Sequence, residues 1–196
     1  MARVLLDVTM SLDGFMAGPR VSAAHPMGEG GLRLHEWIFN TATSEVDAEI
    51  AREMQATTGA VVLGRRTFDV GIGVWNDTPF PAPCFVLTHD PLAERVEKGG
   101  TFTFVTDVHD AHARATAAAG ERDVRLMGAE VAQQFLAAGL VDEIRVQLAP
   151  VLLGAGRRLF DNLGDAHIEL DRLGTVESPY VTHLRFRVRR GGAGRP

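Results

Sequence analysis

The sequence contains almost no cysteine and no long apolar run, and each absence excludes a class of protein. Cys84 is the single cysteine among the 196 residues. An internal disulfide framework is therefore excluded, and a reducing cytoplasm is the expected compartment. A membrane-spanning helix needs a run of about 18 apolar residues, and the sequence has none. The first residues carry Asp7 and alternate like a strand, so they are not expected to be a signal peptide.

The sequence also lacks an excess of positive charge. Its 20 Lys and Arg residues are outnumbered by 25 Asp and Glu residues, which gives a net charge of −5, and the arginines are spread along the chain. This balance argues against a general nucleic-acid binder, so any phosphate site is expected to be local. The length and the 45% hydrophobic content predict one domain over residues 1–190, with a flexible tail at 191–196.

Predicted strands and helices alternate along the first two thirds of the chain. Short apolar runs rich in β-branched residues predict the strands, and capping residues followed by helical periodicity predict the helices. Glycines and prolines predict a loop at 69–82. The expected strands are 2–10, 60–64, 84–87, 101–105 and 124–127, and the expected helices are 44–58, 108–120 and the segment after Gly128.

After residue 142 the pattern changes to strands without helices. Residues 144–148, 168–170 and 184–188 alternate between apolar and polar side chains, which predicts antiparallel strands with one polar face. Alternating strands and helices, followed by strands alone, predict a three-layer α/β/α fold. Its central sheet is expected to be mostly parallel, with antiparallel strands at the C-terminal edge.

The stretch 59–68 is the first candidate for chemistry. Ala60 to Leu63 predict a buried strand, and Gly64, Arg65, Arg66 and Thr67 follow directly. Glycine permits close backbone approach, the N–H groups of a helix start point at an anion, and guanidinium groups suit phosphate. The alternative interpretation is a strand end followed by solvated arginines.

Three other predicted strands also end in polar or glycine-containing turns. In an open α/β sheet, ligands bind beyond the carboxyl ends of parallel strands, so all four turns are expected along one edge. Together they would bind the phosphates of a dinucleotide, and the arginines favour NADPH. Asp13 is either a carboxylate at the substrate side or a structural turn residue before Gly14. The three turns are Ser11–Gly14, Thr88–His89 and Gly128–Ala129–Glu130–Val131.

Four motifs in this order resemble a known family. They are Ser11–Gly18, Gly59–Phe68, Ala138–Arg145 and Ala149–Phe160, and the likeness extends from Arg3 to about Arg189. The chain is similar to the pyrimidine reductase domain that ends bifunctional riboflavin-biosynthesis enzymes, and to the related dihydrofolate reductase-like proteins. Because no deaminase domain precedes these motifs, a stand-alone member is expected. The resemblance implies a dihydrofolate reductase-like fold and, because relatives dimerise through the C-terminal strands, a homodimer.

The resemblance also implies roles for individual residues. Arg65 and Thr67 would bind NADPH phosphates, with Gly64 and Arg66 beside them, while Thr88 and His89 would approach the 2′-phosphate. The turn Gly128–Val131 would hold the pyrophosphate. Relatives usually have two glycines there, so Met127–Gly128 implies a tighter turn or weaker cofactor binding. Leu153 and Gly154 would lie in the segment that closes over the cofactor, and Asp13 would lie at the substrate side.

The implied reaction is hydride transfer from NADPH to a C=N or C=O bond of a pteridine-like or pyrimidine-ribose molecule. The proton could come from Asp13 or from an ordered water. The long segment 19–34 could be a lid, with Trp37 stacking on the substrate ring, but Trp37 could equally pack in a small core cluster. No metal site is expected, because His109 and His112 lack a third ligand. A different class of function, a dinucleotide- or flavin-binding homodimer without turnover, also fits the motifs.

Overall fold

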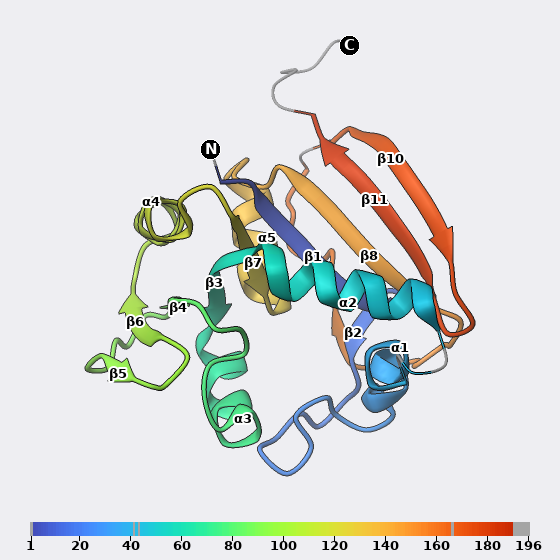
Figure 1. The fold of residues 1–196 in the computed structure, drawn as a ribbon, viewed down its shortest axis with the longest axis horizontal. Helices are drawn as coiled ribbons and strands as arrows, with labels where there is room; N and C mark the ends of the chain where they lie inside the picture. Colours follow the sequence, from blue (N-terminus) through green and yellow to red (C-terminus); the bar gives the residue numbers. More distant parts are fainter. Residues whose placement is uncertain (1, 41, 43, 166, 190–196) are drawn as a thin grey trace.

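The computed structural model describes residues 2–40, 42, 44–165 and 167–189, so the predicted tail lies outside the described residues. Six strands form the parallel part of the main sheet: β1 (Val4–Ser11), β3 (Thr58–Gly64), β4 (Cys84–Leu87), β6 (Thr101–Val105), β7 (Asp123–Met127) and β8 (Glu143–Ala149). Three more pair antiparallel at its two edges: β5 (Arg95–Val96), β10 (Leu170–Glu177) and β11 (Thr182–Val188). The order is β10-β11-β8-β1-β7-β3-β4-β6-β5 (Figure 1).

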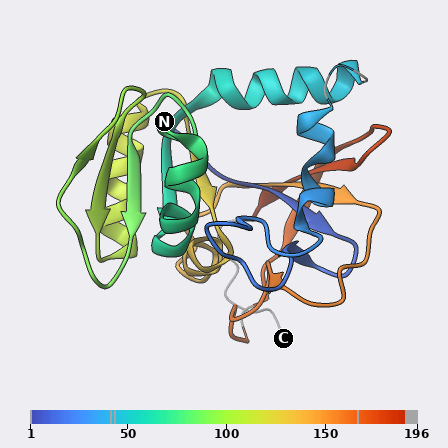
Figure 2. The same cartoon turned by 90° about the horizontal axis from the view of Figure 1, so that it is seen from below.

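Helices cover both faces of this sheet, as the three-layer prediction requires. Val62 of β3 belongs to the core on the side of α4 and α5, whereas its neighbours Val61 and Leu63 belong to the core on the side of α3. Such alternation along one strand is what burial on both faces produces. Figure 2 shows α2 and α3 on one side of the sheet. The helices are η1 (Gly31–His35), α1 (Glu36–Phe39), α2 (Glu45–Thr57), α3 (Arg65–Trp75), α4 (Val108–Ala119) and α5 (Ala129–Ala137).

Two helices begin at side-chain caps that the sequence predicts. The hydroxyl of Ser44 accepts a hydrogen bond from the backbone N–H of Asp47 at the start of α2, at 3.2 Å. The carboxylate of Asp107 accepts from the N–H groups of His109 and Asp110 at the start of α4, at 2.8 and 2.9 Å. Each cap satisfies N–H groups that have no partner within the helix.

The predicted loop at 69–82 is wrong in its first half, because α3 continues to Trp75. A glycine inside a helix costs roughly 1 kcal/mol relative to alanine, which is why Gly71 and Gly73 suggested a loop. Tertiary packing overrides this cost. A Cβ atom on Gly71 would lie 2.3 Å from the Trp75 ring, so the glycine makes room for the indole. Phe68 also packs edge-on against Phe102 and Phe104.

The prediction of antiparallel C-terminal strands is right for β10 and β11 and half right for β8, which pairs antiparallel with β11 and parallel with β1. Its alternation reflects a polar face that is buried. Arg145 and Gln147 are only 5% and 3% exposed, because they hydrogen-bond within the protein. The strand predicted at 168–170 begins at Leu170 and runs on to Glu177.

The remaining short strands, β2 (Phe15–Ala17) and β9 (Arg157–Arg158), pair with each other beside the main sheet. This small ladder joins the segment that follows β1 to the segment that follows β8. Among the described residues, no helix combines the length and the apolar character needed to cross a bilayer.

Candidate functional site

The turns after β3 and β7 touch each other. The two strands are neighbours in the sheet, with Leu63 paired to Met127. Gly128 has a φ of 104°, which favours glycine, and a Cβ atom at this position would lie 2.6 Å from Oγ1 of Thr67. A Cβ atom on Gly64 would lie 3.5 Å from a methyl carbon of Val131. The chain therefore brings two of the predicted glycine turns into direct contact.

The turn after β4 joins them on the other side of β3. Gly64 pairs with Leu87, so Thr88 follows at the same level of the sheet. Arg65 donates from Nη1 to the backbone carbonyl of Asp90 at 3.0 Å and from Nε to Asp69 at 2.9 Å. The hydroxyl of Thr88 accepts from the N–H of Asp90 at 3.2 Å. The side chain of Arg65 thus spans the two turns.

The helices that begin at this edge have no side-chain cap. α3 starts after Gly64 and α5 starts after Gly128, and neither glycine position provides a side-chain hydrogen bond to the first turn. The first N–H groups of both helices are therefore available, and the helix dipoles favour an anion there. Glu130 lies in the first turn of α5, where its carboxylate is 3.6 Å from Nη1 of Arg157.

Asp13 follows β1 at the same edge and is held by several donors. Its carboxylate accepts from the hydroxyl of Ser11 at 2.6 Å and from the backbone N–H groups of Gly154 at 2.7 Å and Leu153 at 3.1 Å. The Ser11 hydroxyl and these N–H groups lower the pKa of the Asp13 carboxyl from 3.8 to about 2. The group is ionised at neutral pH and has no proton to give, which favours the ordered water over Asp13 as the proton donor.

The segment 151–158 is tied to the loop after β1 at further points. The backbone N–H of Leu12 donates to the carbonyl of Val151 at 2.9 Å. The guanidinium of Arg158 lies over the ring of Phe15, 4.4 Å from its centroid, and donates to the carbonyl of Asp13 at 3.1 Å. The predicted site residues Leu153 and Gly154 are therefore fixed next to Asp13.

Trp37 is a core residue, as the alternative interpretation of its sequence holds. It is 2% exposed, its Nε1 donates to the hydroxyl of Thr9 at 2.9 Å, and it meets the ring of His183 edge-on at 5.2 Å. Almost none of its surface is left for a substrate ring, so the prediction that Trp37 stacks on the substrate is not supported. The reason is that α1 folds back onto the sheet and buries the indole beside Leu34.

The segment 19–34, which was a candidate lid, is folded back on itself. Gly18 donates from its N–H to the carbonyl of Met27, and Glu29 donates to the carbonyl of Pro19, both at 2.9 Å. The segment passes close to α3 in two perpendicular views (Figures 1 and 2). Its end forms η1, where burial lowers the pKa of His35.

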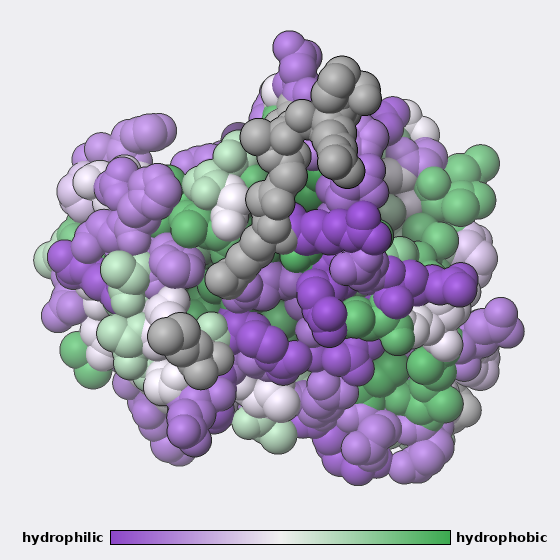
Figure 3. Space-filling model, turned by 90° about the horizontal axis from the view of Figure 1, so that it is seen from above, coloured by the Kyte–Doolittle hydropathy of each residue, from purple (hydrophilic) through white to green (hydrophobic). Residues whose placement is uncertain are grey.

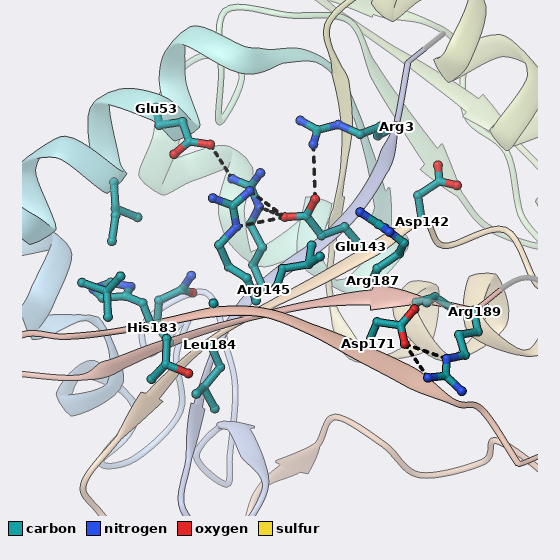
Figure 4. Close-up of a pocket in the computed structure, with 18 of the residues that line it drawn as sticks. Arg3, Glu53, Asp142, Glu143, Arg145, Asp171, His183, Leu184, Arg187 and Arg189 are labelled. Carbon is teal, nitrogen blue, oxygen red and sulfur yellow. Dashed lines mark hydrogen bonds and ion pairs between the residues drawn. The ribbon is translucent and has the colours of Figure 1, made fainter.

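The described residues also form a groove of about 1950 Å³ between α2 and strands β8, β10 and β11, and none of the predicted site residues lines it. Hydrophilic side chains gather across the middle of the face seen in Figure 3. In Figure 4 the carboxylate of Glu143 lies between Arg3 and Arg145, at 3.2 and 2.7 Å. Arg3 and Arg145 are thus paired within the protein, whereas Arg187, which also lines the groove, is exposed and forms no ion pair with the described residues.

Neither the ion pairs of Glu143 nor the buried pair of Asp7 with Arg125 was predicted from the sequence. Asp7 and Arg125 are buried and form an ion pair, and Arg125 donates from Nε to the hydroxyl of Thr58 at 2.9 Å. The available signal was a charged residue in the middle of each apolar strand, because such a residue needs a buried partner. The partners are 118 residues apart, so the sequence alone does not pair them.

Comparison with known proteins gives a consistent family and fold. The family model described as "RibD C-terminal domain" matches residues 2–182. A putative riboflavin biosynthesis protein from Shewanella sp. PV-4 is 23% identical, with a TM-score of 0.72 over 97% of this chain and 100% of that one. A pyrimidine reductase-like protein from Corynebacterium diphtheriae is 16% identical, with a TM-score of 0.62 over 97% and 93%.

A dihydrofolate reductase from Enterococcus faecalis, solved in complex with NADP(H), shares the fold at a greater distance. It is 16% identical, with a TM-score of 0.57 over 95% of this chain and 96% of that one. Among curated proteins, none matches the sequence significantly. At these identities the solved structures establish the dihydrofolate reductase-like fold, and the family model establishes the family.

Proposed function

The chain belongs to the RibD C-terminal domain family, and from this premise we propose that it is an NADPH-dependent reductase. The proposed reaction transfers a hydride to a C=N or C=O bond of a pteridine-like or pyrimidine-ribose molecule. The family is the reductase domain of riboflavin biosynthesis, which supports an oxidoreductase; NADPH and the substrate class are the proposed part.

The observation that carries the proposal is the meeting of two uncapped helix starts with Arg65 at one edge of the sheet. The first turns of α3 and α5 offer N–H groups to phosphate, and Gly64 and Gly128 let it approach the backbone. The side chain of Arg65 reaches the turn after β4, where it would hold the 2′-phosphate together with Thr88. Thr67, Arg66, His89 and Ala129–Val131 complete the proposed cofactor contacts.

In the proposed reaction the chain binds and orients both reactants and limits the access of water. Bound NADPH would supply the hydride. The hydride acceptor also needs a proton. Because Asp13 is ionised and already accepts three hydrogen bonds, we assign the proton to a water molecule at the substrate side.

We also propose a homodimer that buries strand β10. This strand is the last of the nine-stranded sheet, and both of its faces are largely exposed. Leu170, Leu173 and Val176 on it are 38%, 41% and 46% exposed. An edge strand with exposed apolar side chains favours association. Light scattering behind a sizing column should give twice the mass of the chain, and Val176→Glu should shift it toward the mass of one chain.

The function is tested by titrating NADPH while following tryptophan fluorescence, and then by following nicotinamide absorbance with candidate acceptors. Suitable acceptors are dihydrofolate and the pyrimidine intermediate of riboflavin biosynthesis. Saturable quenching together with loss of absorbance supports the reductase. Saturable quenching without turnover on any acceptor favours the dinucleotide-binding homodimer, and absence of saturable quenching contradicts both.

A further inference from the structure

We propose that Asp13 is a positioning residue, whose carboxylate latches residues 151–158, called the strap here, over the carboxyl end of β1. The inference rests on the proposed function, because it assigns Asp13 a role in shaping the reductase site. In this role Asp13 transfers no proton but holds residues 151–158 in place.

The contacts of the carboxylate are divided between the two sides of the latch. Oδ1 accepts from the hydroxyl of Ser11 at 2.6 Å and from the N–H of Leu153 at 3.1 Å, while Oδ2 accepts from the N–H of Gly154 at 2.7 Å. Two successive backbone N–H groups that point to one anion form a concave anion site, which favours the ionised carboxylate. Gly154 has a φ of 72°, so the turn that presents these groups favours glycine.

The strap is fastened again where it reaches α5. The side-chain amide of Gln133 donates to the carbonyls of Arg158 and Leu159 at 3.2 and 3.1 Å. Arg157 lies 3.6 Å from Glu130 in the first turn of that helix. The strap therefore runs from the end of β1 to the helix start that would hold the pyrophosphate. The strap is also held by the pairing of β2 with β9, by the Leu12–Val151 hydrogen bond and by Arg158, whereas its turn at Leu153 and Gly154 is held by the carboxylate of Asp13.

The latch also sets the position of two exposed leucines. Leu12 and Leu152 are 64% and 68% exposed, and the hydrogen bond from the N–H of Leu12 to the carbonyl of Val151 brings their segments together. Exposed apolar side chains at the mouth of a site suit the face of a flat ring. Release of the Leu153–Gly154 turn from Asp13 would free the adjacent Leu152 and would loosen the arrangement of the two reactants.

Proton transfer by Asp13 is the competing role, and its geometry is unfavourable. A protonated carboxyl must give up at least one accepted hydrogen bond, because the oxygen that carries the proton becomes a donor. Here both oxygens face donors. A proton on Oδ1 could be met by the Ser11 hydroxyl turning to accept, whereas a proton on Oδ2 would lose the N–H of Gly154 and loosen the turn of the strap.

The test compares Asp13→Asn with Asp161→Asn, which changes an exposed carboxylate just beyond the strap. Without any cofactor, Asp13→Asn should accelerate hydrogen exchange of the Leu153 and Gly154 amides by about tenfold or more. In turnover it should raise KM by about tenfold with a smaller fall in kcat, and the limbs of the pH profile should stay where they are. Asp161→Asn should change none of these quantities.

A second variant tests the strap without touching the carboxylate. Gly154→Ala strains a backbone with positive φ but meets no atom within 4 Å, so it should fold and displace the N–H groups. It should reproduce the KM increase of Asp13→Asn. Unchanged amide exchange in Asp13→Asn, or loss of kcat and of a pH limb with KM preserved, would overturn the latch. The exchange measurement needs no cofactor. If Asp13→Asn accelerates amide exchange in a protein that does not bind NADPH, the latch stands and only the proposed function is refuted.

Discussion

Helices α2 and α4 differ from α3 and α5 in how they begin. The first two start at Ser44 and Asp107, whose side chains accept hydrogen bonds from the first turn, and the other two start at Gly64 and Gly128 without such bonds. The uncapped pair begins at the carboxyl ends of the adjacent strands β3 and β7. A cap satisfies the N–H groups of the first turn within the protein, whereas without a cap these N–H groups stay available to a ligand.

The same contrast separates two charge-rich regions. Around Glu143, three arginines pair with one carboxylate, and two of them also pair with Asp123 and Glu53. At the carboxyl edge, Arg65 is one-third exposed and lies beside two helix starts. The number of charged residues would have pointed to the groove as the ligand site. The N–H groups of the two uncapped helix starts point to the edge instead.

The largest expected effect comes from closing one of the uncapped starts. In Gly128→Ala the new Cβ would approach Oγ1 of Thr67 to 2.6 Å and would occupy the space proposed for the pyrophosphate. NADPH affinity should fall by about a hundredfold, measured by fluorescence titration, because contacts to two helix starts are lost together. Gly139→Ala is the control, since it also has a positive φ but open space around it. Equal losses of affinity in both variants would contradict the assignment.

A smaller effect is expected from the cation that spans the turns. Arg65→Ala should weaken NADPH by about tenfold or more and NADH much less, because only NADPH carries a 2′-phosphate. Arg114→Ala is a matched control, because Arg114 forms a comparable pair with Asp110 four residues away on α4, as Arg65 does with Asp69 on α3. If Arg65→Ala weakens both nucleotides equally, the 2′-phosphate assignment is wrong.

Removal of a helix cap should lower the stability of the protein without lowering its affinity for NADPH. Asp107→Ala is expected to lower the free energy of unfolding by about 1 kcal/mol, because two N–H groups of α4 lose their acceptor. NADPH affinity should not fall, because in the natural chain Asp107 already occupies these N–H groups, although α4 begins beside the Thr88 turn, whose N–H donates to the carbonyl of Val105 at 2.9 Å. Denaturant unfolding and the fluorescence titration together check this. A loss of NADPH affinity would show that capped and uncapped helices do not differ in function.

The smallest effect concerns the acid stability that Asp13 contributes. Its pKa is lowered from 3.8 to about 2, so the carboxylate stabilises the folded state above pH 3.8 and loses this contribution as the pH falls toward 2. The difference in Tm between the natural chain and Asp13→Asn should therefore be largest near neutral pH and should narrow on acidification. Other carboxylates with lowered pKa values, such as Asp77 and Asp171, are present in both proteins and cancel. A difference that stays constant down to pH 2 would contradict the ionised state.

Much of the fold follows from local patterns in the sequence. The strands β1, β3, β4, β6 and β7 are apolar runs with clear ends, and Ser44 and Asp107 mark helix starts by their own chemistry. Local patterns fail where tertiary packing decides. α3 tolerates Gly71 because Trp75 fills the space, and the polar face of β8 is buried because its charges find distant partners.

The candidate site, like the fold, has parts that the sequence predicts and parts that it does not. The glycine turns after β3 and β7 could be predicted, because strand ends and glycines are local features; the binding roles of their residues stay predictions. The contacts of Asp13 could not be derived, since Leu153 and Gly154 are 140 and 141 residues away. Trp37 could not be assigned between lid and core, because its burial depends on how α1 folds back onto the sheet.

The most direct measurement of the central claim is an NADPH titration followed by the backbone amide resonances of the chain. We predict the largest shifts at the first-turn amides of α3 and α5, around 65–67 and 129–131, with the amides of the capped start of α2 unchanged. Saturable binding whose shifts fall instead in the groove between α2 and β11, or titration without any shift at the two glycine starts, would contradict it.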